Sequence, residues 1–233
     1  EITYGDWSSD VCSSDLEQVG AHVVYGVVGH KCHAKMLLIV RKEKIQKSGK
    51  FNLVRYAHLG TGNYHPRTAK LYTDFGMMTC DPLITKDIHQ VFQQLTGTGM
   101  QLETREIWEA PFTMLEQLVH HIRAEAKAAK QGKKARIIGK MNALLEKTII
   151  EELYKASQAG VKIDLIVRGV CALQPGVKGL SENIKVRSMI GRFLEHHRIY
   201  YFYSSGSELV YLSSADWMER NLLRRVEVAF PVK

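Results

Sequence analysis

The chain has 233 residues, of which 45% are hydrophobic and 24% charged, a composition typical of a globular protein rather than a disordered one. This length is enough for one or two domains with a full core, and no apolar stretch approaches the roughly 20 residues of a membrane-spanning helix. The formal net charge of +8 favours a polyanionic partner, such as a nucleotide, nucleic acid or an anionic lipid surface; a generic basic surface is the alternative. The four cysteines lack CxxC spacing, which indicates free thiols and no metal site.

Residues 1–16 have neither the period of a strand nor that of a helix. They resemble the translated adapter sequence found at the ends of some metagenomic gene predictions; the alternative is an ordinary polar tail. We expect this segment to be non-native and the true upstream chain to be missing, so the segment is left out of the fold prediction.

Regular patterns begin at Glu17. In the first half of the chain, β-branched and apolar runs predict strands over residues 21–28, 34–40, 52–58 and 71–79. A helix is predicted to begin at Asp81-Pro82, with the proline at its first position, and to end at Gly97. A break near Ala110-Pro111 suggests a domain boundary, with one domain over residues 17–108 and another over 109–233.

The second half begins with a helix whose apolar side carries Met114, Leu118 and Ile122. Further elements are predicted as a helix over 142–158 and strands over 135–138, 161–167, 197–203, 208–212 and 225–230. Strands with covering helices in both halves predict an α/β fold of two domains, each a mixed β-sheet flanked by helices.

A histidine followed by a cation two positions later occurs twice, as His33-Ala34-Lys35 and as His196-His197-Arg198. On a strand, residues i and i+2 point to the same side, so each histidine is predicted to project together with its cation. An imidazole can attack phosphorus or move a proton, and a cation can hold the oxyanion. Two such half-sites facing each other would form one phosphoryl-transfer centre.

Several stretches resemble the C-terminal half of bacterial polyphosphate kinases of type 1, and the resemblance runs from about Glu17 to the end of the chain. The stretches are residues 29–36, 56–64, 68–74, 140–144, 167–169, 191–196, 213–218 and 224–231. They occur in the family's order, which makes the resemblance far more specific than one histidine motif. The last two domains of that family are similar to the phospholipase D fold, which explains the doubled motif.

The resemblance implies an ATP:polyphosphate phosphotransferase, which reversibly transfers the terminal phosphate of ATP to inorganic polyphosphate through a phosphohistidine. His33 matches the phosphorylated nucleophile, and His196 matches a second family histidine that donates or accepts a proton near the nucleotide. Tyr72 and Arg168 match residues that contact the nucleotide. From their chemistry, Lys35 and Arg198 are predicted to neutralise the metaphosphate-like transition state.

The same resemblance implies Mg²⁺ as a cofactor, with ligands upstream of this chain, and ATP, ADP and polyphosphate rather than nucleic acid as partners. It also implies a homo-oligomer in the full-length enzyme and a cytoplasmic location, with peripheral association with the inner membrane as a further option. Because the family's upstream domains are absent here, inactivity of the isolated chain is an open alternative.

Two other functions remain open. A phospholipase D-type phosphodiesterase would use the same histidines, but such enzymes carry an acidic residue a few positions after the motif, and residues 37–42 contain none. A non-catalytic polyanion-binding fragment is suggested by charge alone. Within the second motif, the H-x-R spacing favours His196 over His197, which stands where the family usually has serine. The Gly60-Thr61-Gly62-Asn63 loop is predicted to offer backbone N–H groups to phosphate.

Overall fold

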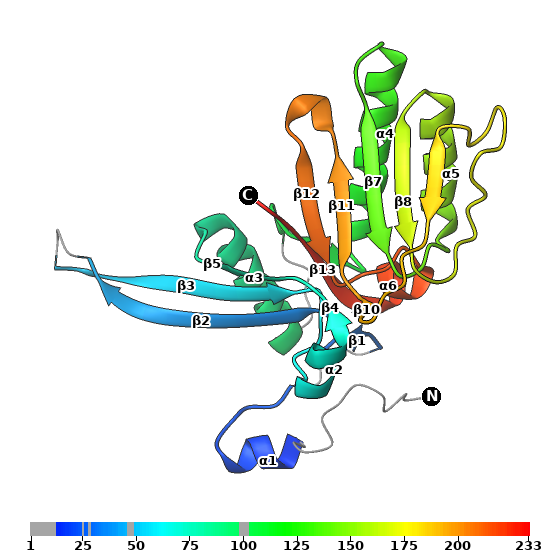
Figure 1. The fold of residues 1–233 in the computed structure, drawn as a ribbon. Coiled ribbons are helices and arrows are strands. Elements are labelled where there is room, and N and C mark those ends of the chain that lie inside the picture. Colours follow the sequence, from blue (N-terminus) through cyan, green and yellow to red (C-terminus); the bar gives the residue numbers. More distant parts are fainter. Residues whose placement is uncertain (1–12, 25, 28, 46–48, 98–102) are drawn as a thin grey trace.

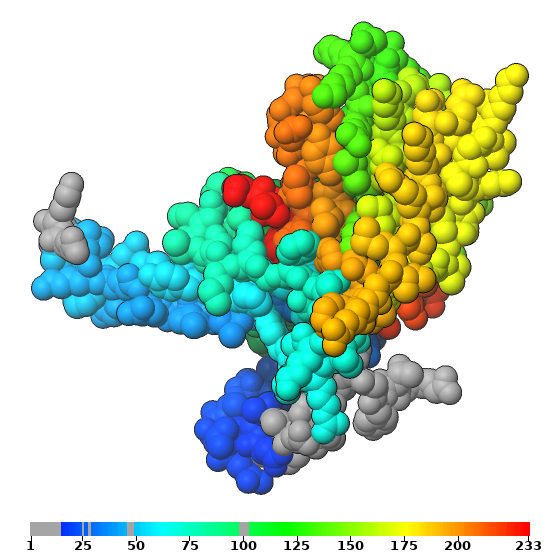
Figure 2. All heavy atoms as spheres, viewed as in Figure 1, coloured from blue at the N-terminus to red at the C-terminus, as the bar shows by residue number. Residues whose placement is uncertain are grey.

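The computed structural model describes residues 13–24, 26–27, 29–45, 49–97 and 103–233. It has an α/β fold, as predicted, built on a mixed main sheet with helices packed on one face and a smaller antiparallel sheet beside it. The smaller sheet extends into a long hairpin that projects away from the body of the molecule (Figures 1 and 2).

The main sheet has eight strands among the described residues. Seven follow the spatial order β1 (Lys31–Cys32), β13 (Arg225–Pro231), β12 (Leu209–Ser213), β11 (Arg198–Phe202), β7 (Arg136–Met141), β8 (Lys162–Val167) and β9 (Ile184–Arg187), and β6 (Trp108–Ala110) pairs with β13. Strands β7, β8 and β9 run parallel to one another, and β1 runs parallel to β13, whereas the other pairs are antiparallel. The sheet is therefore mixed.

Two helices, α4 (Met114–Lys130) and α5 (Lys147–Gln158), cover one face of the main sheet. Met114, Leu118 and Ile122 recur every four residues along α4 and are fully buried, as the sequence pattern predicts. They belong to one core with Ile137 and Leu165 from the sheet. This core fixes the strands whose ends carry the second histidine motif.

The hairpin consists of β2 (Lys35–Lys44) and β3 (Phe51–Gly60), and β5 (Gly76–Thr79) pairs with β3. Helix α3 (Pro82–Thr96) packs on this sheet and begins as predicted, because the Asp81 side chain accepts from two backbone N–H groups of the first turn and Pro82 needs no such partner. Ile84 and Ile88 of α3 share a core with Phe230 of the main sheet. The two halves of the chain are therefore joined by a common core.

The remaining elements are short. They are α1 (Ser13–Gln18), α2 (Pro66–Leu71), β4 (Tyr72–Thr73), β10 (Leu194–Glu195), the 3-10 helix η1 (Ser204–Gly206) and α6 (Glu219–Arg224). Strands β4 and β10 pair in parallel, which links the first half of the chain to the segment just before His196. Within the described parts of the chain, every helix is too short or too polar to cross a membrane.

Three predictions of secondary structure are wrong. No strand forms over 21–28 in the residues described there, because this run finds no neighbouring strand to pair with. The strand predicted over 71–79 is divided between β4, which pairs with β10, and β5, which pairs with β3. The helix over 142–158 begins only at Lys147, because Leu144 is held in bridges to Cys171 and Trp217 and Glu146 is the extended residue that caps the helix. The sequence has no clear pattern that predicts the short elements β6, β9 and α6.

Glu109 of β6 provides a test of this packing. Its side chain is 1% exposed, its Oε1 has no hydrogen-bond partner among the described residues, and burial raises the pKa of its carboxyl to about 7. Since the unfolded value is near 4.3, ionisation between pH about 4.5 and 7 opposes folding, and stability is lost as pH rises through this window. We expect Glu109→Gln to gain about 2–3 kcal/mol relative to the parent between pH 5 and pH 8, measured by urea unfolding. The exposed Glu116→Gln is the matched control, and parallel pH profiles for Glu109→Gln and the parent would contradict the assignment.

Candidate active site

His33 lies at the edge of the main sheet, immediately after β1. Strand β1 pairs with β13 so that Cys32 is opposite Val226, and the backbone N–H groups of His33 and Ala34 both donate to the Val226 carbonyl, at 2.9 and 3.1 Å. This register places the imidazole Nδ1 2.8 Å from Oε2 of Glu227. A carboxylate can only accept, so Nδ1 carries the proton and the lone pair of the imidazole is on Nε2.

Glu227 is fully buried, and two further donors fix its carboxylate. The Ser214 hydroxyl donates to Oε2 at 2.5 Å, and the Asn221 amide donates to Oε1 at 2.6 Å. Sequence reasoning assigned no role to these three residues. The available signal was an acidic residue inside the apolar strand Val226–Val228, because a buried charge needs a partner.

Lys35 does not lie on the same strand as His33, contrary to the sequence expectation. His33 follows β1 in the main sheet, whereas Lys35 begins β2 in the hairpin sheet, so the first motif spans the passage between two sheets. The side chains are nevertheless brought together: Lys35 is 6% exposed, and its ammonium donates to the His33 carbonyl at 2.5 Å. The prediction that His33 and Lys35 project from one strand is therefore wrong, although the two residues do lie next to each other.

The second motif likewise falls between two strands, because β10 ends at Glu195 and β11 begins at Arg198. His196 stacks on Tyr72 with ring centroids 4.6 Å apart and an interplanar angle of 27°. The pairing of β10 with β4 places Tyr72 there, and the His196 backbone N–H donates to the Thr73 carbonyl at 3.0 Å. Two predicted nucleotide-binding residues from opposite halves of the chain are thus in contact.

His196 is held in its neutral form. Its pKa is lowered to about 3, first because burial disfavours the imidazolium and then because the charges of Arg198 and Lys35 oppose it, with a smaller contribution from His33. His33 and Lys35 can contribute only if the two half-sites lie close together. The structure therefore joins both histidine motifs into one basic centre.

Arg198 is engaged by a buried carboxylate. Its Nε and Nη2 lie 3.1 and 2.9 Å from the two carboxylate oxygens of Asp216, and both side chains are at most 5% exposed. Burial raises the pKa of Asp216, but the attraction of Arg198 outweighs this and lowers it. The remaining nitrogen, Nη1, donates to the His196 carbonyl at 2.8 Å. Arg198 thus lies beside His196 with its charge balanced from behind by Asp216, which sequence reasoning did not assign.

Arg168 and Lys140 complete the cationic side of the centre. Arg168 follows β8 and donates from Nη1 to the Glu195 carbonyl at 2.8 Å; burial and the nearby Arg198 lower its pKa. Lys140 pairs with the Glu195 carboxylate and lies 2.8 Å from Nε2 of His197. The other ring nitrogen of His197 is 3.0 Å from the Thr73 carbonyl. His197 is therefore tied between Lys140 and β4, and of the two adjacent histidines it is His196 that stacks on Tyr72.

The glycine loop after β3 does not present an open array of N–H groups. Gly60 is paired on both sides, with Lys35 and Gly76. A Cβ atom at Gly62 would come within 1.6 Å of a carboxylate oxygen of Asp74. Because a carboxylate already lies against this glycine, the loop is not arranged as the predicted phosphate cradle. Among the described residues, no group of three or more His, Cys, Asp and Glu side chains could hold a metal ion.

The Arg198–Asp216 pair makes a testable contribution to stability. We expect Arg198→Met to lose about 3–5 kcal/mol in urea unfolding, because it leaves the Asp216 carboxylate buried without its partner. In the double variant with Asp216→Asn, the buried charge is removed and the Asn142 N–H keeps an acceptor, so most of the loss should be recovered. Equal destabilisation of the single and double variants would show that the ion pair does not account for the effect.

Comparison with known proteins places the chain in a family. The family model for polyphosphate kinase C-terminal domain 2 matches residues 107–233, which is over half of the chain, and the model for C-terminal domain 1 matches residues 9–101. A polyphosphate kinase from Paraburkholderia phytofirmans is 71% identical over 220 residues, and one from Burkholderia ambifaria is 69% identical over 221 residues. These alignments cover 94% and 95% of this chain but 32% of each relative.

A solved structure gives the same result. The crystal structure of a polyphosphate kinase from Porphyromonas gingivalis superposes with a TM-score of 0.86 at 39% sequence identity, covering 94% of this chain and 33% of that one. The chain spans about a third of the length of the relatives it matches, and the matching part corresponds to their two C-terminal domains. The chain belongs to the polyphosphate kinase family.

Proposed function

We propose that the chain forms the phosphoryl-transfer core of a polyphosphate kinase, which moves the terminal phosphate of ATP reversibly onto inorganic polyphosphate through a phosphohistidine at His33. The observation that carries this proposal is the hydrogen bond of 2.8 Å from Nδ1 of His33 to the buried Glu227. It aligns a neutral imidazole in a centre that also contains Lys35 and His196. The relatives are polyphosphate kinases, and they supply the substrate class.

The first step forms a bond between Nε2 of His33 and the terminal phosphorus of ATP, while the bond from that phosphorus to the bridging oxygen breaks and ADP leaves. In the second step, a terminal oxygen of polyphosphate attacks the same phosphorus and the N–P bond breaks, which lengthens the polymer by one phosphate. Glu227 keeps the proton of Nδ1 in place through both steps, so the ring stays aligned and its positive charge is stabilised.

The cations have distinct roles in this proposal. Lys35 lies at the His33 backbone and stabilises the charge on the transferred phosphoryl group, and Arg198 does the same from the second half-site. His196 is neutral while its neighbours are cations, but an anionic phosphate bound between them would raise its pKa and let it exchange a proton with the departing or attacking oxygen. Tyr72 and Arg168 hold the nucleotide, by stacking and by a guanidinium–phosphate contact.

The finer organisation belongs to the same proposal. The two phospholipase D-like domains would comprise residues 17–108 and 109–233, and residues 1–16 would be non-native. Mg²⁺ would arrive with ATP or be held by upstream residues; the described residues do not form a site for it, and no step is assigned to it. The full-length enzyme would be a cytoplasmic homo-oligomer that acts on ATP, ADP and polyphosphate and not on nucleic acid. A phosphodiesterase is disfavoured by the absence of an acidic residue in positions 37–42.

Phosphoprotein formation from γ-labelled ATP and magnesium tests the proposal. We expect an acid-labile, alkali-stable label in the parent chain, no label in His33→Ala, and a rate of labelling lowered about 100-fold or more in Glu227→Gln, because the neutral amide no longer favours the Nδ1–H tautomer. His196→Ala distinguishes a role in forming the intermediate from one in consuming it: label that accumulates but does not pass to polyphosphate places His196 in the second step.

The exposed His120→Ala is the control for loss of a histidine far from the site and should label like the parent. A label that survives His33→Ala would assign the nucleophile elsewhere. If the folded parent chain acquires no label at all, the isolated chain lacks the activity, and the phosphodiesterase and polyanion-binding alternatives become the better explanations.

A further inference from the structure

One face of the main sheet is open over three strands. Along β8, Ile163, Leu165 and Val167 are buried in the core beneath α4 and α5, so the alternate residues of this strand point to the opposite face. In the part of the chain that the structure describes, no helix packs on this opposite face of β7, β8 and β9 (Figure 1). Among the described residues, the side chains of this face therefore have no covering element.

The cations of this face form a ladder that follows the register of the sheet. Arg136 of β7 pairs with Lys162 of β8, Lys185 of β9 pairs with Asp164, and Arg187 pairs with Ile166. Successive rows are two residues, or roughly 6.6 Å, apart along the strands. The three strands are parallel, so all rows advance in one direction.

The ladder ends at the candidate active site. The last row, Arg187 and Ile166, continues to Lys140, which pairs with Glu195 beside the second histidine motif. Arg168 follows directly after β8 and contacts the Glu195 carbonyl. Each row from the open face to the site that contains His196 thus carries at least one cation, with Asp164 in the middle row.

Charge on this face is strongly unbalanced. Asp164 is the sole carboxylate on β7, β8 and β9, whereas five cations lie on their open face: Arg136, Lys140, Lys162, Lys185 and Arg187. Its two oxygens lie 3.0 Å from Nη2 of Arg136 and 3.7 Å from Nη2 of Arg187, yet these arginine side chains are 47% and 72% exposed. The Asp164 carboxylate therefore holds the guanidinium groups of Arg136 and Arg187 near the sheet, while much of each arginine side chain stays exposed to solvent.

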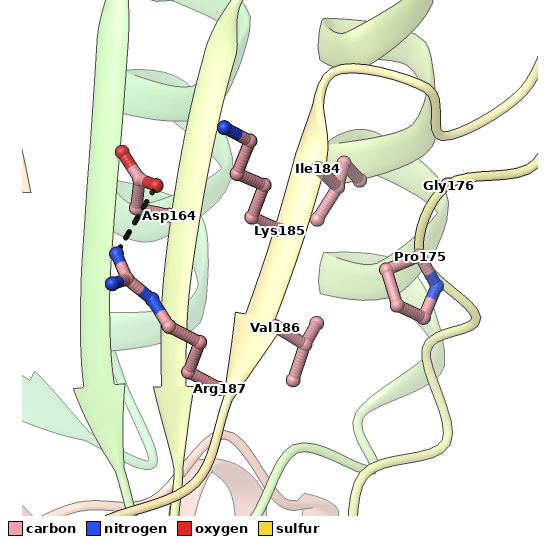
Figure 3. Close-up of a pocket in the computed structure, with 7 residues that line it drawn as sticks. All are labelled: Asp164, Pro175, Gly176, Ile184, Lys185, Val186 and Arg187. Atoms are coloured by element: carbon pink, nitrogen blue, oxygen red, sulfur yellow. Dashed lines mark ion pairs between the residues drawn. The ribbon is translucent and has the colours of Figure 1, made fainter.

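A hollow adjoins this cluster at the edge of the sheet. A cavity of about 460 Å³ is lined by Asp164, Lys185 and Arg187 together with Pro175 and Gly176 of the preceding loop. Figure 3 shows Lys185 and Arg187 reaching from β9 toward β8, whereas Ile184 and Val186 point the other way. The cationic side chains lie on one side of the strand and are shared by the cavity and the open face.

We propose that this open face, defined by Arg136, Lys162, Lys185 and Arg187, binds the inorganic polyphosphate chain and leads it to His33. The inference rests on the proposed function and adds a site for the polymer outside the reacting centre. A linear polyphosphate carries charge on every unit and no base, which suits repeated cations. Strands β7, β8 and β9 contain no aromatic residue, and the one aromatic ring beside them, Tyr201 of β11 opposite Ile138, has its hydroxyl bonded to Glu208 at the margin of the face. Repeated cations with no aromatic ring among them suit polyphosphate better than single-stranded nucleic acid.

Binding of a fluorescently end-labelled linear polyphosphate to the whole chain tests the inference. We expect the triple variant Lys162→Gln, Lys185→Gln, Arg187→Gln to bind the polymer about tenfold or more weakly than the parent, with a shallower dependence on salt, because fewer counterions are released. The variant keeps the Arg136–Asp164 ion pair, and an unchanged urea unfolding midpoint verifies that it is folded.

A second triple variant, Lys127→Gln, Lys130→Gln, Lys147→Gln, removes the same charge from α4 and α5 on the other side of the sheet and should stay within about twofold of the parent. In the opposite direction, Asp164→Asn removes the carboxylate of the face and should tighten binding. Equal losses in the two triple variants, or no gain in Asp164→Asn, would overturn the inference, as would equal competition by a single-stranded oligonucleotide. If the variants fail to show the expected changes in polyphosphate binding but His33 still becomes labelled from ATP, the polymer site is wrong and the proposed function stands. If the first triple variant loses polyphosphate binding selectively but the parent chain acquires no label, the polymer site stands and the proposed function does not.

Discussion

The buried carboxylate of Glu227 is the constraint on which the first half-site depends. Burying a charge is costly unless its oxygens are satisfied, and here three donors from three segments satisfy them: His33 after β1, Ser214 after β12, and Asn221 in α6. The contact from His33 forms only when β1 has paired with β13 in the correct register. Orientation of the imidazole is therefore a consequence of completing the main sheet, and the first half of the chain contributes its histidine to a sheet built mainly by the second half.

The second half-site uses the same physical arrangement with a different pair. Asp216 lies behind Arg198 as Glu227 lies behind His33, and each carboxylate is buried and hydrogen-bonded by further groups. Basic groups from both halves can then be packed together without leaving all their charge unbalanced. The two short strands β4 and β10 complete the junction, because their pairing brings Tyr72 against His196.

Local sequence signals predicted the local parts of this structure well. The Asp81-Pro82 cap and the apolar stripe of α4 depend on neighbours within a few residues, and the doubled histidine motif identified the residues that meet in the centre. Glu227 and Asp216 escaped prediction because their partners are remote: His33 is 194 positions from Glu227. The break in each histidine motif has the same origin, since the step from one sheet to another is set by pairing with distant strands and not by the residues at the break. The run over 21–28 shows the converse, because in its described residues β propensity without a partner strand gives no strand.

In the proposed function, the electrostatics of the centre would tie proton transfer to the binding of an anion. His196 is neutral first because it is buried and then because Arg198 and Lys35 lie close to it, and these two cations also attract phosphate. A phosphate that entered between them would offset the part of the pKa depression that the two cations cause, so the ring would gain affinity for a proton when an anion is present. A centre built in this way does not need His196 to be protonated before phosphate binds. An imidazolium at this position would repel Arg198 and Lys35, on which phosphate binding depends. It acquires its acid at the moment when the oxygen that needs a proton has arrived.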